Sequence, residues 1–194
     1  MARARIPLRY SQGFNPHPVM SLAAPRPVGV ASADDLLAVS LDQPEGEPDR
    51  VDAAELLGRL NAQAPRGMRF LAAERFEGKS PQPCRVSYRT PLEGRRIEQV
   101  GRRLDELAGM ESWPLERLTT AKRGSERGRF APRTIDVRPL VADLRISEGS
   151  LCMSLVGRCD MWARPGEVLR LLGLDERADL ARTVRTCIDC KQEP

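Results

Sequence analysis

The stretch from residue 84 to residue 120, CRVSYRTPLEGRRIEQVGRRLDELAGMESWPLERLTT, decides the fold, because it holds a strand, a helix and a second strand in succession. Its first six residues and its last nine are strand candidates. Between them, apolar residues recur at spacings of three and four, at Ile97, Val100, Leu104 and Leu107. This spacing predicts an amphipathic helix between two strands.

The ends of this helix are also marked in the sequence. Thr90 and Glu93 have capping-box spacing, and Pro91 stands at the first helical position. Gly109 follows the last apolar residue of the series. Capping boxes and N-terminal prolines are typical of helix starts, and glycine is typical of helix ends. The pattern therefore predicts a helix that begins near residue 90 and ends at Gly109.

On the N-terminal side, short extended segments surround one further helix. Strands are expected over residues 5–10, 19–24, 36–41 and 68–76. Asp52 and Glu55 have capping-box spacing ahead of an apolar helix face, and Pro65 with Gly67 ends that helix.

On the C-terminal side, the same alternation continues. Strands are expected over residues 134–140 and 150–157. In the first of them, Ile135, Val137 and Pro139 are expected to face one way, with Asp136 and Arg138 facing the other. A short helix has Pro165 near its start and Gly173 as its stop, and residues 180–188 fit either a helix or a strand.

Strands interleaved with one or two helices per half, on short connections, predict an α+β fold. We expect two ferredoxin-like α/β sandwich halves, the first of them incomplete at its N-terminus. The polar loop EGKSPQP, residues 77–83, is the expected boundary. The halves are then residues 1–77, with the GFNPHP loop, and residues 78–194, with a basic loop.

Composition narrows the classes of partner. The chain of 194 residues has a net charge of +4 and very few lysines, so arginine carries most of its positive charge. Arginine suits phosphate recognition, although a GC-rich genome produces the same bias. No apolar run approaches a membrane span and no signal peptide is recognisable, so a cytoplasmic protein without membrane contact is expected.

The most distinctive motif is the loop SQGFNPHP, residues 11–18, which holds the only histidine. Pro16 and Pro18 restrict the residues before them to extended conformations, so the loop is expected to be stiff. Three interpretations stay open. Phe14, Asn15 and His17 form a recognition surface for a base or a peptide, or the loop is a plain hairpin with Phe14 in the core, or His17 is an acid–base catalyst.

A second candidate is the basic stretch KRGSERGRFAPRTIDVRP, residues 122–139, which has Phe130 inside it. Clustered arginines around an aromatic side chain are typical of phosphate-contact surfaces, and a solvated loop is the alternative. The predicted nucleic-acid contacts here are Lys122, Arg123, Arg127, Arg129, Arg133, Asp136 and Arg138.

The five cysteines do not predict a disulfide framework in a chain without an export signal. Cys187 and Cys190 have the spacing of half a zinc site, but a second pair is required. Cys152 and Cys159 lie seven residues apart, which on a regular strand places them on opposite faces. Cys187 and Cys190 are therefore weak metal candidates, and no cofactor is expected.

Residues 9–41, RYSQGFNPHPVMSLAAPRPVGVASADDLLAVSL, resemble the signature of the radical-SAM-linked protein family. This is an uncharacterised bacterial domain encoded beside, or fused to, a cobalamin-binding-type radical SAM protein. The matching positions are Ser11, Gly13 to Pro18, Pro27 to Gly29, Ser32 and the acidic pair after it, Asp136, Arg138, Pro139, Arg164, Pro165, Arg182 and Thr183.

The resemblance also shows two departures. Family members usually begin with a strand and a helix upstream of the GFNPHP loop, so we expect that the reading frame extends upstream or that a partner supplies these elements. The CIDC tail is not a feature of the family.

The resemblance implies a non-catalytic accessory module that works with a radical SAM protein and binds RNA or positions a substrate. One alternative is an RNA-processing or RNA-modifying enzyme with His17 as its acid–base catalyst. Another is a scaffold that contacts protein alone.

Overall fold

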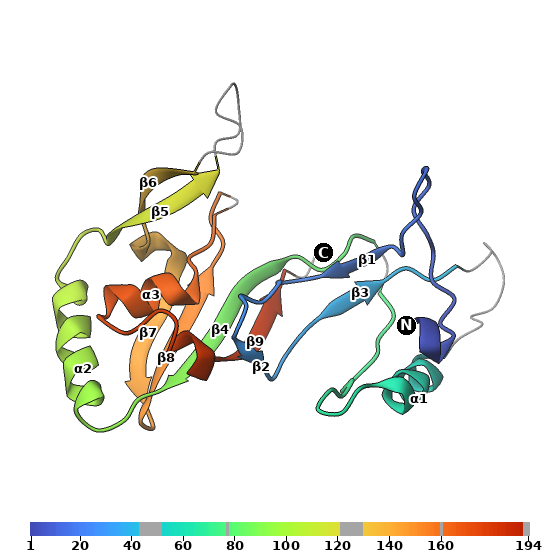
Figure 1. Ribbon diagram of the computed structural model, residues 1–194, viewed down its shortest axis with the longest axis horizontal. Coiled ribbons are helices and arrows are strands. Elements are labelled where there is room, and N and C mark those ends of the chain that lie inside the picture. Colours follow the sequence, from blue (N-terminus) through green and yellow to red (C-terminus); the bar gives the residue numbers. More distant parts are fainter. Residues whose placement is uncertain (43–51, 77, 121–129, 160, 192–194) are drawn as a thin grey trace. The chain divides into compact units, whose positions relative to one another are not determined.

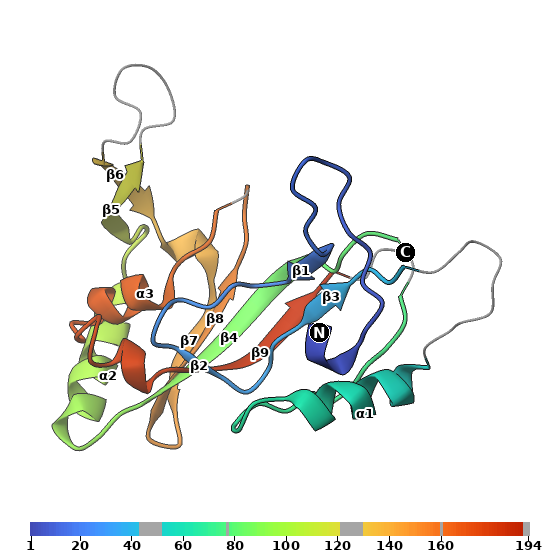
Figure 2. The ribbon, with the colours of Figure 1, turned by 45° about the vertical axis from the view of Figure 1, so that its right-hand side comes forward.

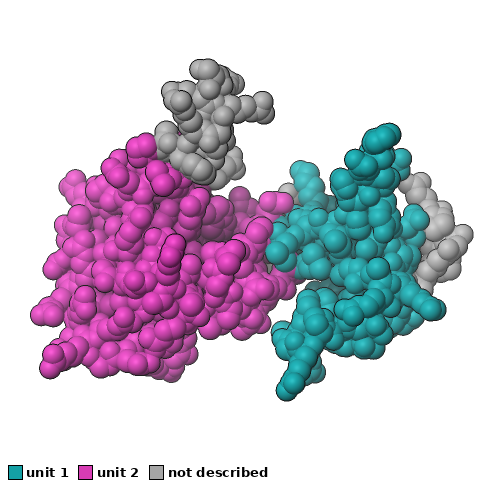
Figure 3. All heavy atoms as spheres, viewed as in Figure 1, with its two compact units in different colours: residues 1–23, 37–81 teal, residues 24–36, 82–194 magenta. Residues whose placement is uncertain are grey.

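The computed structural model describes residues 1–42, 52–76, 78–120, 130–159 and 161–191. The chain divides into two compact units (Figure 3). Unit 1 comprises Met1–Ala23 and Leu37–Pro81, and unit 2 comprises Ala24–Leu36 and Gln82–Pro194. Residues 24–36, which the expected division placed in the N-terminal half, therefore cluster with unit 2.

Unit 2 is built on a five-stranded sheet with the strand order β2-β9-β4-β8-β7 (Figure 1). The strands are β2 (Ala31–Ser32), β4 (Pro83–Pro91), β7 (Val141–Ser147), β8 (Ser150–Val156) and β9 (Val184–Cys190). All neighbours are antiparallel except β2, which runs parallel to β9. The helices α2 (Arg95–Ala108) and α3 (Pro165–Leu171) follow β4 and β8.

The main connectivity of unit 2 is therefore β4-α2-β7-β8-α3-β9. An antiparallel hairpin of β5 (Pro114–Thr120) and β6 (Phe130–Asp136) is inserted between α2 and β7. The predicted mixture of helices and sheets is confirmed by this architecture and by the three α-helices of the described residues.

The core of unit 2 lies between one face of the sheet and the two helices. On β8, Leu151, Met153 and Leu155 are buried in alternation, as expected for a strand with one covered face. They belong to the same cluster as Val100 of α2 and Val168 of α3. The apolar residues that alternate along the strands and those that recur along α2 therefore pack together in one layer.

The predicted start of α2 is wrong. β4 continues to Pro91, and α2 begins at Arg95 after Gly94, whose φ is 53°. Thr90 is fully buried in the strand, where its hydroxyl shares a hydrogen bond of 2.8 Å with that of Thr183. Strand pairing with β8 and β9 outweighs the local capping signal at this position. The predicted end is confirmed, because Gly109 is the C-cap.

Two further differences follow from backbone irregularities. β7 was not predicted, because a shift of register between Val141 and Asp143 breaks its alternation. Ile135 and Val137 are buried as expected, but Pro139 is exposed. Its neighbourhood, Arg138–Leu140, is the 3₁₀ turn η2, which ends the period of two. Residues 180–188 divide into the 3₁₀ turn η3 (Leu180–Arg182) and most of β9.

Unit 1 is smaller. It holds the 3₁₀ turn η1 (Ala2–Ala4), the antiparallel pair β1 (Met20–Leu22) and β3 (Leu37–Val39), and the helix α1 (Ala53–Gln63). Its core is formed by Ala4, Ile6, Leu8 and Leu60. The predicted cap of α1 is confirmed, because the Asp52 carboxylate accepts hydrogen bonds from the N–H groups of Ala54 and Glu55.

The prediction of a strand at residues 68–76 is wrong. No strand is formed there. The N–H and C=O of Phe70 instead bond to the side chain of Asn61, at 2.8 and 2.9 Å. A side-chain amide thus takes the place of a strand partner.

Among the described residues, unit 1 has a two-stranded sheet and one α-helix, so two ferredoxin-like halves are not confirmed. In the described part of the chain, no helix has the length and apolar character needed to cross a membrane.

Candidate functional site

The GFNPHP loop is the closed tip of a hairpin in unit 1. Tyr10 and Pro18 form an antiparallel bridge at its base. Above this bridge, the N–H of Ser11 donates to the carbonyl of His17 at 2.8 Å, and the N–H of His17 donates to the Ser11 hydroxyl at 3.1 Å. Figure 2 shows the loop in dark blue, projecting from the rest of unit 1. These bonds and the two prolines together restrict the loop.

The side chains at the tip face solvent. The ring of Phe14 is 100% exposed, and Asn15 and His17 are also exposed. The interpretation that placed Phe14 in the core is therefore wrong. A fully hydrated aromatic ring on a restricted loop presents both faces for stacking at little loss of conformational entropy.

His17 lacks the surroundings of a catalytic base. Within the described ranges, no hydrogen bond or ion pair involves its imidazole. Acid–base catalysts are usually oriented by a second group and sit where substrate can be held away from water. The geometry therefore gives no support to the interpretation of His17 as a catalyst.

Of the predicted basic contacts, Lys122, Arg123, Arg127 and Arg129 lie outside the described residues. Arg133 is exposed on β6, opposite Arg117 of β5 in the hairpin register. The structure assigns Phe14, Asn15 and His17 to unit 1, and Arg133, Asp136 and Arg138 to unit 2.

Asp136 and Arg138 hold the base of the hairpin. One Asp136 oxygen accepts the N–H of Trp113 at 2.8 Å and that of Arg138 at 3.0 Å. The Arg138 guanidinium donates to the carbonyl of Glu111 at 2.8 Å and is still exposed. Asp136 is therefore a structural residue, while Arg138 keeps donors available to a ligand.

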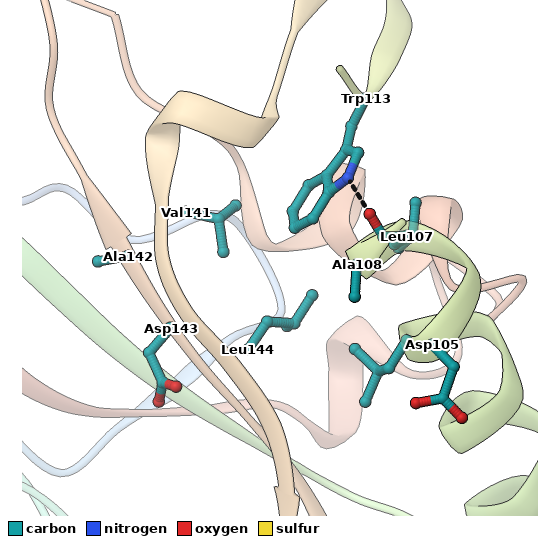
Figure 4. A pocket seen from close by; sticks show the side chains of 9 residues that line it. Asp105, Leu107, Ala108, Trp113, Val141, Ala142, Asp143 and Leu144 are labelled. Carbon is teal, nitrogen blue, oxygen red and sulfur yellow. Dashed lines mark hydrogen bonds between the residues drawn. The ribbon is translucent and has the colours of Figure 1, made fainter. Parts of the chain in front are cut away.

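Asp136 and Arg138 also line a groove that the sequence analysis did not predict. We call it the Trp113 groove; it consists of two adjoining hollows of about 360 and 440 Å³ that share Trp113 and Val141. The first lies between the end of α2 and the start of β7 (Figure 4). The Trp113 indole N–H donates to the carbonyl of Leu107 at 2.9 Å, which fixes the ring in the wall. The signal in the sequence was a tryptophan a few residues after the end of a helix.

Two matched positions of the family signature, Ser32 and Asp35, have structural roles as partners of Arg185. Arg185 of β9 is fully buried and donates to the Ser32 hydroxyl at 3.2 Å and to the carbonyl of Ala24. It also pairs with the carboxylate of Asp35. Burial lowers the pKa of the Arg185 guanidinium, because water no longer stabilises its charge. Arg185 therefore anchors residues 24–36 to the edge of the sheet.

A second buried ion pair attaches the β5–β6 hairpin to α3. The Arg117 guanidinium donates to both oxygens of Glu167, each at 2.6 Å, and to the carbonyl of Trp162 at 2.8 Å. Glu167 also accepts the N–H of Arg164 at 2.8 Å, which caps the helix. The predicted helix start at Arg164 and Pro165 is confirmed. The ion pair with Arg117 explains why Glu167 lies in the first turn of this helix.

Cys187 and Cys190 both lie on β9. In the described part of the chain, no group of three or more His, Cys, Asp or Glu side chains is placed to hold a metal ion. Burial raises the pKa of both thiols, and the hydrogen bond from Cys187 to Asp189 raises that of Cys187 further. Thiols of this kind are less ionised at neutral pH than free cysteine, which disfavours metal binding and nucleophilic chemistry.

These features define a mixed α/β protein with a stiff loop that presents an aromatic side chain. No catalytic cluster is recognisable among its described residues. The chain belongs to a family described as an uncharacterised protein conserved in bacteria, DUF2344, whose model matches residues 1–170. No curated protein and no solved structure matches the chain. The family description names no partner, so the link to a radical SAM protein stays a prediction.

Proposed function

We propose that this protein is a non-catalytic accessory module that binds RNA through the loop at residues 11–18. The observation that carries the proposal is the complete exposure of the Phe14 ring on a loop closed by hydrogen bonds. Stacking of a base on an aromatic side chain contributes about 1–3 kcal/mol, and every base has a face that can stack.

The neighbouring side chains suit the same role. Asn15 is exposed beside Phe14 and offers an amide that pairs with base edges. Asn15 and His17 each precede a proline and are held extended, so their side chains project from a backbone that is already ordered. Single-stranded RNA is the favoured form, because its bases are free to stack on a protein ring.

The positive charge supports an anionic partner. The chain has a net charge of +4, and Arg133 and Arg138 keep exposed guanidinium groups on unit 2. Together with the basic residues 122–129, they are the proposed phosphate contacts. Each such contact makes RNA binding more sensitive to salt.

Two finer proposals accompany this function. The strand order β9-β4-β8-β7, with α2 following β4 and α3 following β8, supports a ferredoxin-like assignment for unit 2. A radical SAM protein is the proposed partner, and this rests on the resemblance at residues 9–41 alone.

Fluorescence anisotropy with a labelled single-stranded RNA of mixed sequence tests the proposal. Phe14→Ala should weaken binding by roughly 5- to 150-fold, which corresponds to the loss of one stacked base. Phe76→Ala is the matched control, because Phe76 is also an exposed phenylalanine of unit 1 and lies outside the loop.

The wild-type chain should bind RNA at low salt, and its affinity should fall as salt is raised. Absence of binding at low salt would overturn the proposal, and so would equal losses in the two phenylalanine variants. If His17→Ala abolished turnover of an RNA substrate while binding persisted, the enzyme interpretation would replace ours.

A further inference from the structure

The Trp113 groove combines an apolar floor with an acidic rim. Leu104, Leu107, Trp113, Val141 and Leu144 form the floor of the first hollow. Asp105 and Asp143 stand on either side of it (Figure 4). In the adjoining hollow, the lining carboxylates are those of Glu111 and Asp136. Among the described residues, Arg138 is the one basic residue that lines either hollow, although the chain as a whole has a net charge of +4.

The position of Asp105 is unfavourable for the helix that carries it. It lies in the last turn of α2, which has no basic residue. The C-terminal end of a helix dipole favours cations, so a carboxylate there weakens the helix. Asp105 is exposed, and within the described ranges it forms no hydrogen bond or ion pair. Departures from local rules of this kind are expected where a side chain serves a ligand.

The strand beside the groove has an open edge. β7 is the last strand of the sheet and pairs with β8 alone among the described strands. The register shift between Val141 and Asp143 places a bulge at Ala142, which also lines the first hollow. Unpaired backbone groups on an edge strand are available to an extended peptide, and a bulge limits pairing at that end.

We infer that the Trp113 groove binds an extended segment of a partner protein in which an apolar side chain is flanked by lysine or arginine. The apolar side chain packs on the floor formed by Trp113 and Leu144. The cations lie against Asp105 and Glu111, because the Asp143 carboxylate already pairs with Arg145. The volume of the first hollow, about 360 Å³, is near the lower end of the roughly 300–1,000 Å³ typical of ligand sites. The carboxylates of the first hollow disfavour RNA phosphates there, and Arg138, a proposed phosphate contact, lines only the adjoining hollow.

Nuclear magnetic resonance of the full ¹⁵N-labelled chain tests this inference. The chain has two tryptophans, and only Trp113 lines the groove, so the Trp162 indole is an internal control. A Trp162→Phe variant assigns the two indole signals. The probes are blocked heptapeptides with the sequences KLKVKLK, KSKSKSK and ELEVELE.

The peptide KLKVKLK should shift the Trp113 indole signal in a saturable way and leave that of Trp162 unchanged. Combined Asp105→Lys and Glu111→Lys substitutions should weaken its binding at least tenfold and improve binding of ELEVELE. Glu98→Lys is the matched control, because Glu98 is exposed on the same helix but does not line the groove. Asp105→Lys is compatible with folding, because a cation near the end of α2 is favourable.

Several results would overturn the inference. They are no saturable shift up to about 1 mM KLKVKLK, equal binding of KSKSKSK, and an equal loss in the Glu98→Lys variant. Displacement of the peptide by a single-stranded RNA that shifts the Trp113 signal would assign the groove to nucleic acid instead. None of these outcomes depends on the loop at residues 11–18, so the proposal of RNA binding is tested separately.

Discussion

The ion pair between Arg117 and Glu167 allows a quantitative test of how the β5–β6 hairpin is attached to unit 2. The two side chains are 12% and 4% exposed, so water screens their interaction little. Arg117→Met removes both bonds to the carboxylate and leaves Glu167 buried with the N–H of Arg164 as its remaining partner. Breaking one side of a buried pair costs about 3–5 kcal/mol, a large fraction of a typical stability of about 5–15 kcal/mol.

The double variant separates the free energy that the ion pair contributes from the cost of leaving one buried charge unpaired. Glu167→Gln keeps an acceptor for the Arg164 N–H but removes the negative charge. With both substitutions, no uncompensated charge stays buried, so the double variant should lose only about 1–2 kcal/mol. The coupling energy of the cycle should then exceed about 2 kcal/mol.

Urea unfolding monitored by circular dichroism gives these free energies. Arg89→Met is the matched control, because Arg89 and Glu148 form a surface pair whose side chains are 45% and 79% exposed. Exposed pairs contribute about 0–1 kcal/mol, so this variant should be nearly neutral. A loss below about 1 kcal/mol for Arg117→Met, or strictly additive losses in the cycle, would refute the reasoning.

Gly157→Ala should destabilise the protein by about 1–3 kcal/mol, because an added Cβ would lie 2.6 Å from the Trp162 ring. Gly58→Ala in α1 should instead stabilise it by about 0.5–1 kcal/mol, since nothing lies within 4 Å of the new atom, and thermal melting compares the two. Hydrogen bonds from the N–H groups of Ala178 and Arg177 lower the pKa of Asp175 below 3.8. Its contribution to stability is therefore complete above that value and lost as pH falls through the lower folded value. Melting temperatures of the wild type and Asp175→Asn should differ at neutral pH and converge in acid; a constant difference would contradict this.

Local signals in the sequence predicted most elements but not their limits. The cap at Asp52 and the stop at Gly109 were predicted correctly, because both depend on neighbouring backbone alone. The cap at Thr90 was wrong, because pairing partners more than 60 residues away extend β4 past it. β7 was missed because its bulge hides the period of two.

The candidate site divided in the same way. The stiffness of the loop at residues 11–18 follows from prolines and a glycine close in sequence, so it was predictable. The sequence alone left open whether Phe14 lies in the core or at the surface, and the structure shows it exposed. The Trp113 groove joins residues from positions 104 to 144, and no periodicity links an acid on a helix to a tryptophan after it. Arg185 and Glu167 were overlooked because a buried charge has no signature apart from the partner that pairs with it.

The anchoring of residues 24–36 by Arg185 has a consequence for dissecting the protein. The chain leaves unit 1 after Ala23, supplies β2 to unit 2, and returns at Leu37. No single cut therefore separates the units. A fragment that begins at Gln82 lacks the strand beside β9, the Ala24 carbonyl and the Asp35 carboxylate, so it must bury a guanidinium without its partners or expose it. Residues 24–36 are thus needed to complete the interior of unit 2.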